Sequence, residues 1–144
     1  MITKSVQIGD IDSNLPDDSV MQIIRDQYLR DTTVTVVLIG SVTCKKKHVD
    51  WKIGSSISDT KYSSRSGLRD VLLPSYHSSL GIDYGKYNHD SIPPRSSENI
   101  KYGYSNIYDL SNSPYDIQSW IHNAFDKRTK IEPDNSHPSF KYNR

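Results

Sequence analysis

Cysteine and glutamate are nearly missing from this sequence. The 144 residues contain one cysteine, Cys44, which cannot form a disulfide within the chain, so a reducing compartment is the natural setting. Glutamate occurs only as Glu98 and Glu132, and we expect both in a loop or in the tail. Chemistry that needs a glutamate on the helix after a central strand therefore has no candidate here.

An excess of charge is missing as well. Lysine and arginine number 18 against 17 acidic residues, and the formal net charge of +1 gives no preference for nucleic acid. No apolar run approaches the ~20 residues of a membrane span, and the N-terminus lacks a signal-peptide pattern. We therefore expect a cytoplasmic protein with neither a nucleic-acid nor a membrane partner.

Metal-binding patterns are also missing. The histidines are scattered, with no pair at i, i+4 and no cysteine at ligand spacing. No metal site is predicted.

Alternating helix and strand patterns are present. Apolar residues recur every three to four positions over 17–30 and 48–59, and again in a segment that opens at Ser113–Pro114 and closes at 127–130, which predicts three helices. Strands are predicted at 4–8, 33–39, 68–73 and 105–110.

This order indicates a single α/β domain with a mainly parallel sheet over residues 1–130, followed by an irregular tail at 131–144. Segment 33–39 (TVTVVLI) is apolar on both faces, which is typical of a central strand covered on both sides. Residues 75–104 are expected to form a long connection, and connections of that length are often functional.

One pair of residues conflicts with this fold. Arg69 and Asp70 are neighbours in the strand at 68–73, so their side chains point to opposite faces. A covered strand would bury both charges, at a cost of several kcal/mol unless each is paired. We therefore expect this strand either to shrink to 71–73 or to lie at an edge.

The candidate site is the turn after Ile39, because ligands of open parallel sheets bind at the carboxyl ends of the strands. Gly40 and Ser41, followed by a helix N-terminus, could hold a phosphate, or they could form a plain strand–helix turn. The lysines at 45–47 are better explained as a solvated face than as a nucleotide clamp. Cys44, four residues before His48, is either a nucleophile or, more simply, a small buried thiol.

The sequence resembles a known family. The residues TVTVVLIGSVTCKKKHVDWKIGSSI (33–57) and the preceding KSVQIGDIDSNLPDDSVMQIIRDQYLRD (4–31) are similar to the TIR-like domain of the bacterial Thoeris antiphage defence protein (ThsB-type). The later stretches GLRDVLLPSYH, SIPPR, ENIKYGY and NIYDLS, and the helix with Trp120, resemble the same family.

The resemblance implies a flavodoxin-like, TIR-type fold that consumes NAD and releases nicotinamide. The product would be an ADP-ribose-derived signal for an effector of a Thoeris system. With NAD as substrate or ligand and no other cofactor expected, the candidates for nucleotide binding are Gly40, Ser41, His48 and Trp51.

Two departures from the family change the expectation. The family's catalytic glutamate, which stands between an aromatic and an aliphatic residue, corresponds to Lys52 between Trp51 and Ile53. The family also begins with a further strand and helix that are missing before Met1, and their loss would expose an apolar sheet edge.

We therefore predict a shortened, catalytically inactive copy that acts as an interaction or signalling module. Its partner would be a second copy, forming a homo-oligomer, or an intact TIR-like protein. The alternatives are an active NAD nucleosidase or cyclase, and a module that senses nucleotides without cleaving them.

Overall fold

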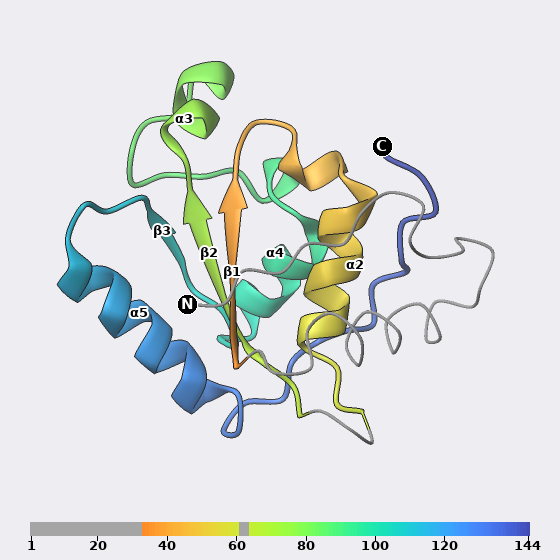
Figure 1. The fold of residues 1–144 in the computed structure, drawn as a ribbon. Coiled ribbons are helices and arrows are strands. Elements are labelled where there is room, and N and C mark those ends of the chain that lie inside the picture. The colour runs from red at the N-terminus through yellow and green to blue at the C-terminus, as the bar shows by residue number, and fades with distance from the viewer. Residues whose placement is uncertain (1–32, 61–63) are drawn as a thin grey trace.

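A computed structural model describes residues 33–60 and 64–144 (Figure 1). In chain order its elements are β1 (Val34–Ile39), the 3-10 helix η1 (Thr43–Lys45), α2 (Lys47–Ser56), β2 (Gly67–Leu72), α3 (Pro74–Leu80), the 3-10 helix η2 (His89–Ser91), α4 (Pro94–Lys101), β3 (Ile107–Asp109) and α5 (Pro114–Lys127). The strand expected at 4–8 and the helix expected at 17–30 lie outside the described residues. The expectation that a first strand and helix are missing before Met1 stays a prediction.

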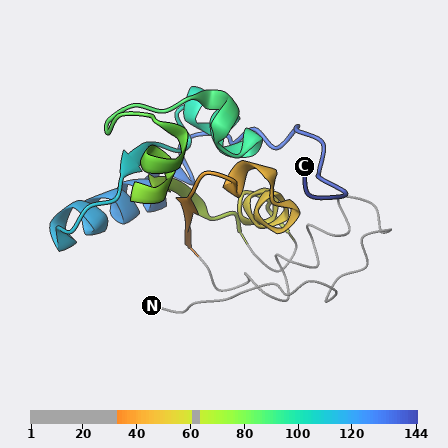
Figure 2. The same cartoon turned by 90° about the horizontal axis from the view of Figure 1, so that it is seen from above.

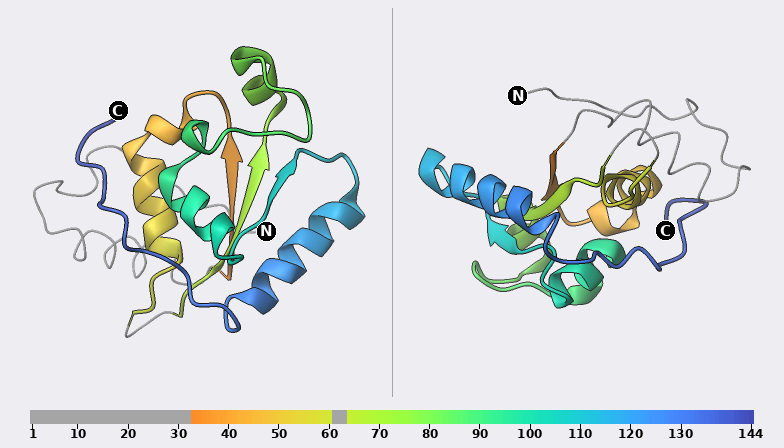
Figure 3. Two further views of the ribbon diagram at one scale, coloured as in Figure 1. Left: turned by 180° about the vertical axis from the view of Figure 1, so that it is seen from behind. Right: turned by 90° about the horizontal axis from the view of Figure 1, so that it is seen from below.

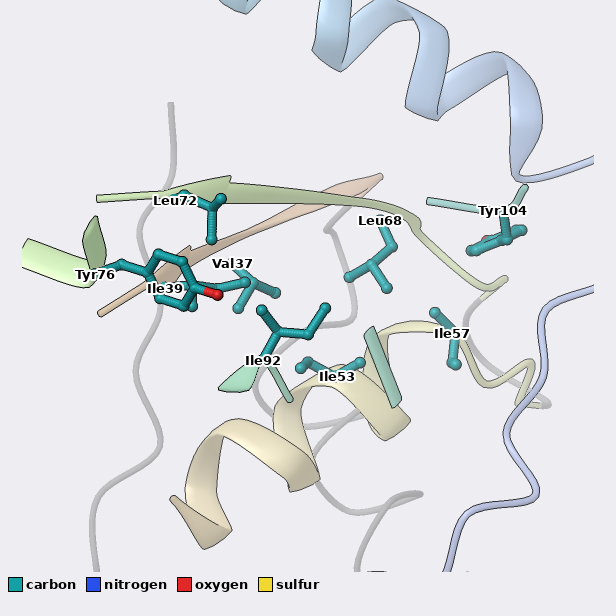
Figure 4. Packing of buried hydrophobic residues seen from close by; sticks show 9 residues of the cluster. All are labelled: Val37, Ile39, Ile53, Ile57, Leu68, Leu72, Tyr76, Ile92 and Tyr104. Carbon is teal, nitrogen blue, oxygen red and sulfur yellow. The ribbon is translucent and has the colours of Figure 1, made fainter. Parts of the chain in front are cut away.

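The three strands form one parallel sheet in the order β1–β2–β3. Helix α2 lies on one face of this sheet and α5 on the other (Figure 4). Seen along the strands, α4 lies on the same side as α2 (Figures 2 and 3). The predicted α/β class with a parallel sheet between helices is confirmed.

The main core lies between the sheet and α2 (Figure 4). Alternate residues of β1, Val37 and Ile39, point into it. They share the core with Ile53 on α2 and with Ile57, the residue that caps the C-terminal end of that helix. Burial of each such side chain stabilises the fold by roughly 1.5–3 kcal/mol. The remaining members of the cluster are Leu68, Leu72, Tyr76, Ile92 and Tyr104.

Strand β1 is present where it was predicted, but it is not central among the strands that the structure describes. It lies at an edge of the sheet that the described residues form, and the side chains of Val36 and Leu38 are 42% and 54% exposed. The expectation of a central strand covered on both faces is therefore wrong for this sheet. The apolar pattern predicted the strand correctly but could not reveal which of its faces is covered.

Strand β2 takes the central position, and all six of its residues are buried. Arg69 and Asp70 are 1% and 0% exposed. The expectation that these charges would shorten the strand or push it to an edge is wrong. Each charge is buried on its own face of the sheet with its own set of partners.

Arg69 lies on the face that α5 covers. Its Nε donates to the carbonyl oxygen of Trp120 at 2.9 Å, its Nη1 donates to the carbonyl oxygen of Leu68 at 3.0 Å, and its Nη2 donates to Oδ1 of Asn123. Oxygens of neutral groups thus satisfy a buried cation. Hydrogen bonds to a charged group contribute more than neutral ones, which offsets part of the cost of burial.

Asp70 lies on the opposite face, toward α4. Its two carboxylate oxygens accept hydrogen bonds from the hydroxyl groups of Ser96 at 2.6 Å and Ser105 at 2.7 Å. Burial raises the pKa of Asp70 from 3.8 to about 6, although both hydroxyls and the Arg69 charge act to lower it. At neutral pH, ionisation of this buried carboxyl group therefore destabilises the folded state.

Helix α5 packs closely on the far face of β2. A Cβ atom added to Gly67 would lie 2.2 Å from the carbonyl oxygen of Ala124, so only glycine allows this approach. The rings of Tyr108 and Trp120 stack with centroids 4.3 Å apart and join α5 to β3. The predicted start of this helix at Ser113–Pro114 is confirmed.

The stretch 75–104 is not the long irregular connection that we expected. It contains most of α3, then η2 and α4, and both α-helices start with a proline in the first turn. Glu98 consequently lies on α4 and not in a loop. The short length and polar composition of these helices concealed them.

Candidate functional site

The turn after β1 contains Gly40 and Ser41, the first two residues predicted to bind a nucleotide. The N–H of Gly40 donates to Oγ1 of Thr43 at 2.9 Å, which closes the turn on itself. At the start of α2, the N–H of Lys47 donates to Oδ1 of Asn143 at 2.8 Å. This N–H group is therefore taken by a side chain from the C-terminal end and is not available to an anion.

His48 and Trp51 lie in the first half of α2. Their ring centroids are 5.4 Å apart, and Nζ of Lys47 lies 4.9 Å from the Trp51 ring. Trp51 is only 4% exposed, and its Nε1 donates to the carbonyl oxygen of Phe140 at 2.8 Å. The indole is thus a packed anchor whose polar atom already has a protein partner.

Asp50 is buried next to Trp51. Its Oδ1 accepts from Nε of Arg95 at 3.0 Å, and its Oδ2 accepts from the N–H of Phe140 at 2.9 Å. Arg95 itself is fully buried. We assign this ion pair a structural role, because both carboxylate oxygens have partners within the protein.

Lys52 stands on α2 between the buried Trp51 and Ile53 and is itself half-buried. Partial burial lowers the pKa of its ammonium group from the ordinary value. Cys44, in η1, is a half-buried free thiol. Neither of the two pockets described below is lined by Lys52, Cys44 or any predicted nucleotide-binding residue.

A cluster that the sequence reasoning missed lies at the carboxyl ends of β2 and β3. Nε2 of His77 lies 2.7 Å from Oδ1 of Asp109, and its Nδ1 lies 2.9 Å from the carbonyl oxygen of Ile82. Oδ2 of Asp109 accepts from the N–H of Gly85 at 2.6 Å, and the ring of Tyr84 stacks on His77. An aspartate at the end of a parallel strand was the available signal. The cluster fastens the loop after α3 to the sheet.

Two of the pockets that the described residues line bear on function. A groove of about 560 Å³ runs between α5 and β1, and its apolar lining includes Val34, Ile117, Ile121 and Phe125. A second hollow, of about 710 Å³, lies beside α4, and its titratable lining is His89, Asp90, Glu98, Lys101 and His137. The first pocket suits an apolar partner, and the second mixes both signs of charge.

Metal ligands do not gather in the part of the chain that the structure describes: no three His, Cys, Asp or Glu side chains are placed to hold an ion. Among the described helices, none has the length and apolar character needed to cross a membrane.

The comparisons with known proteins agree with the resemblance seen in the sequence. Residues 2–70 match the family described as Thoeris protein ThsB, TIR-like domain. The match includes β1, α2 and most of β2, and residues 71–144 lie outside it. No curated protein and no solved structure matches the chain.

Proposed function

We propose that this chain is a defence-related TIR-like domain that does not consume NAD and serves as an interaction or signalling module, because residues 2–70 match the family described as Thoeris protein ThsB, TIR-like domain. The observation that carries this proposal is Lys52. It stands on α2 at the position that the resemblance gives to the catalytic glutamate.

The charge of Lys52 opposes the reaction. Cleavage of the bond between nicotinamide and ribose builds positive charge on the ribose, and a carboxylate stabilises that charge. Two unit charges ~4 Å apart interact by about 4 kcal/mol at an effective dielectric near 20. Repulsion in place of attraction therefore raises the barrier by up to ~8 kcal/mol, or about five to six powers of ten in rate.

The neighbours of Lys52 do not supply a replacement. The carboxylate of Asp50 is buried and bonded to Arg95 and to the backbone of Phe140. The indole N–H of Trp51 is bonded to Phe140 as well. Both residues hold the fold together, which leaves this helix without a carboxylate directed at a ligand.

Nicotinamide release tests the proposal. The purified chain is incubated with NAD beside Lys52→Glu, and nicotinamide is measured by chromatography. We expect no release by the wild type. Release by the wild type at enzymatic rates would refute the proposal in favour of the alternative, an active NAD nucleosidase or cyclase. Release by Lys52→Glu alone would support the proposal, because the charge at this one position would then decide between an inactive and an active domain.

The interaction role rests on the face shared by β1 and α5. Val36 and Leu38 are exposed on β1, Ile117 and Phe125 are 37% and 38% exposed on α5, and the 560 Å³ groove runs between the two elements. Among the described strands β1 lies at an edge of the sheet, and a strand edge with apolar side chains is a common place for another chain to add a strand. We propose that a second TIR-like chain covers this face, with a further copy of this protein as its occupant.

Analytical ultracentrifugation tests this occupant. We expect the wild type to self-associate and Leu38→Asp to shift it toward monomer. Leu110→Asp is the matched control, because Leu110 is similarly exposed at 47% but lies beyond β3. A monomeric wild type at the highest soluble concentration would refute self-association, and an intact TIR-like protein would then be the occupant to test.

A further inference from the structure

The C-terminal residues bind to the fold in the way that a peptide ligand binds to a groove. Residues 135–144, here called the strap, contain no helix or strand and lie along α2 (Figures 1 and 3). The strap runs antiparallel to α2: Asn135 bonds to the carbonyl oxygen of Gly54, near the end of the helix, and Asn143 bonds to the N–H of Lys47 at its start.

The centre of the strap is clamped through its backbone. The N–H of Phe140 donates to Oδ2 of Asp50 at 2.9 Å, and its carbonyl oxygen accepts from Nε1 of Trp51 at 2.8 Å. The Phe140 side chain is only 2% exposed, and the guanidinium carbon of Arg144 lies 4.0 Å from its ring centroid. A backbone clamp combined with a buried aromatic anchor is a familiar mode of peptide recognition.

Helix α4 provides the other wall. Nη1 of Arg95 donates to Oδ1 of Asn135 at 2.8 Å, and Nη2 donates to the hydroxyl of Ser139 at 3.1 Å. The same guanidinium is held in place by Asp50 at 3.0 Å. This surface therefore presents fixed donors to the oxygens of an extended segment. Its backbone N–H groups find acceptors in Oδ2 of Asp50, which bonds Phe140, and in the carbonyl oxygen of Lys45, which bonds Arg144.

We propose that the surface formed by α2 and α4 is a peptide-binding groove that accepts residues 135–144 of a second copy of this chain in place of the resident strap. The second copy carries the same asparagine, serine and phenylalanine groups at the same spacing, so every contact described above can form in trans. The resident strap competes at an effective concentration of about millimolar because it belongs to the same chain. The strap of a second copy can therefore replace it only where the resident strap is weakened or where the local concentration of chains is high. This surface is separate from the β1–α5 face.

Binding of a labelled peptide tests the groove. A fluorescein-labelled peptide of residues 131–144 is titrated into the full chain and into Phe140→Ala, and fluorescence anisotropy is measured without NAD, so that the outcome is independent of catalysis. We expect Phe140→Ala to bind the peptide at least about ten-fold more tightly than the wild type does, because its own strap has lost the anchor. A peptide carrying the same alanine should bind at least about ten-fold more weakly than the native peptide.

Two results would overturn the proposal. The first is a folded Phe140→Ala chain, judged by circular dichroism, that binds the native and the alanine peptides equally or binds neither. The second result concerns Asn143→Ala, a variant that keeps the Phe140 anchor and removes only the outer contact to Lys47. This variant tests the proposal if Phe140→Ala does not fold. Peptide binding by Asn143→Ala that is no tighter than that of the wild type would then refute the groove.

Discussion

Replacing Asp70 by asparagine should stabilise this protein at neutral pH. Asparagine has nearly the same shape as aspartate, and its amide can keep both neighbours: its oxygen accepts from one serine hydroxyl and its NH₂ group donates to the other. The buried partners Ser96 and Ser105 therefore remain satisfied. What the substitution removes is a negative charge in a fully buried position.

The magnitude follows from the pKa of Asp70. Burial raises it from 3.8 to about 6, a difference of roughly two units at 1.36 kcal/mol per unit, or about 3 kcal/mol. Since the folded state holds the proton more strongly than the unfolded chain does, this group lowers the free energy of unfolding as the pH rises from about 4 to about 6. The loss is complete above that window, so we expect Asp70→Asn to be more stable than the wild type by about 1–3 kcal/mol at pH 7.5.

Urea unfolding at several pH values between 4 and 8 measures this difference. The advantage of Asp70→Asn should shrink toward zero near pH 4, where the wild-type carboxyl group is protonated in the fold. Asp83→Asn is the control, because Asp83 is exposed, and its effect should be small at every pH. The reasoning fails if Asp70→Asn is less stable than the wild type at pH 7.5, or if the difference between them does not change with pH.

Two further substitutions test the packing of the fold. Gly67→Ala places a methyl group 2.2 Å from the carbonyl oxygen of Ala124, so thermal denaturation should show a loss of at least about 2 kcal/mol, and an unchanged melting temperature would show that α5 can move away freely. Arg95→Met leaves the carboxylate of Asp50 buried without its cation, so urea unfolding should show a free energy of unfolding lower by about 3–5 kcal/mol. Asp50→Asn added to the same chain should restore most of this loss, because it removes the unpaired charge.

The sequence predicted the elements whose local signals agree with their surroundings. Helix α5 was found because Pro114 opens it and because its apolar residues recur at helical spacing, and β2 was found within one residue at each end. The turn at Gly40 and the position of Trp51 on a helix also followed from local pattern. These signals depend only on neighbours in the chain.

The features that were missed depend on partners far away in the sequence. Arg69 on β2 is buried against oxygen atoms from α5, some 50 residues later in the chain, and no local sequence pattern indicates such a partner. The position of the strap was missed for the same reason, since its contacts join Asp50 and Trp51 to Phe140, about 90 residues later in the chain. The edge position of β1 was missed because an apolar run shows that a strand can be covered on both faces, and not that it is.

The opposite charges on β2 also determine how that strand can align. The α5 side presents the carbonyl oxygen of Trp120 and the amide oxygen of Asn123 to Arg69, whereas the α4 side offers the hydroxyls of Ser96 and Ser105 to a carboxylate. A shift of the strand by one residue would turn Asp70 toward the Trp120 carbonyl, leaving two oxygens face to face with no hydrogen between them. The two buried charges therefore favour the observed register by electrostatics as well as by shape.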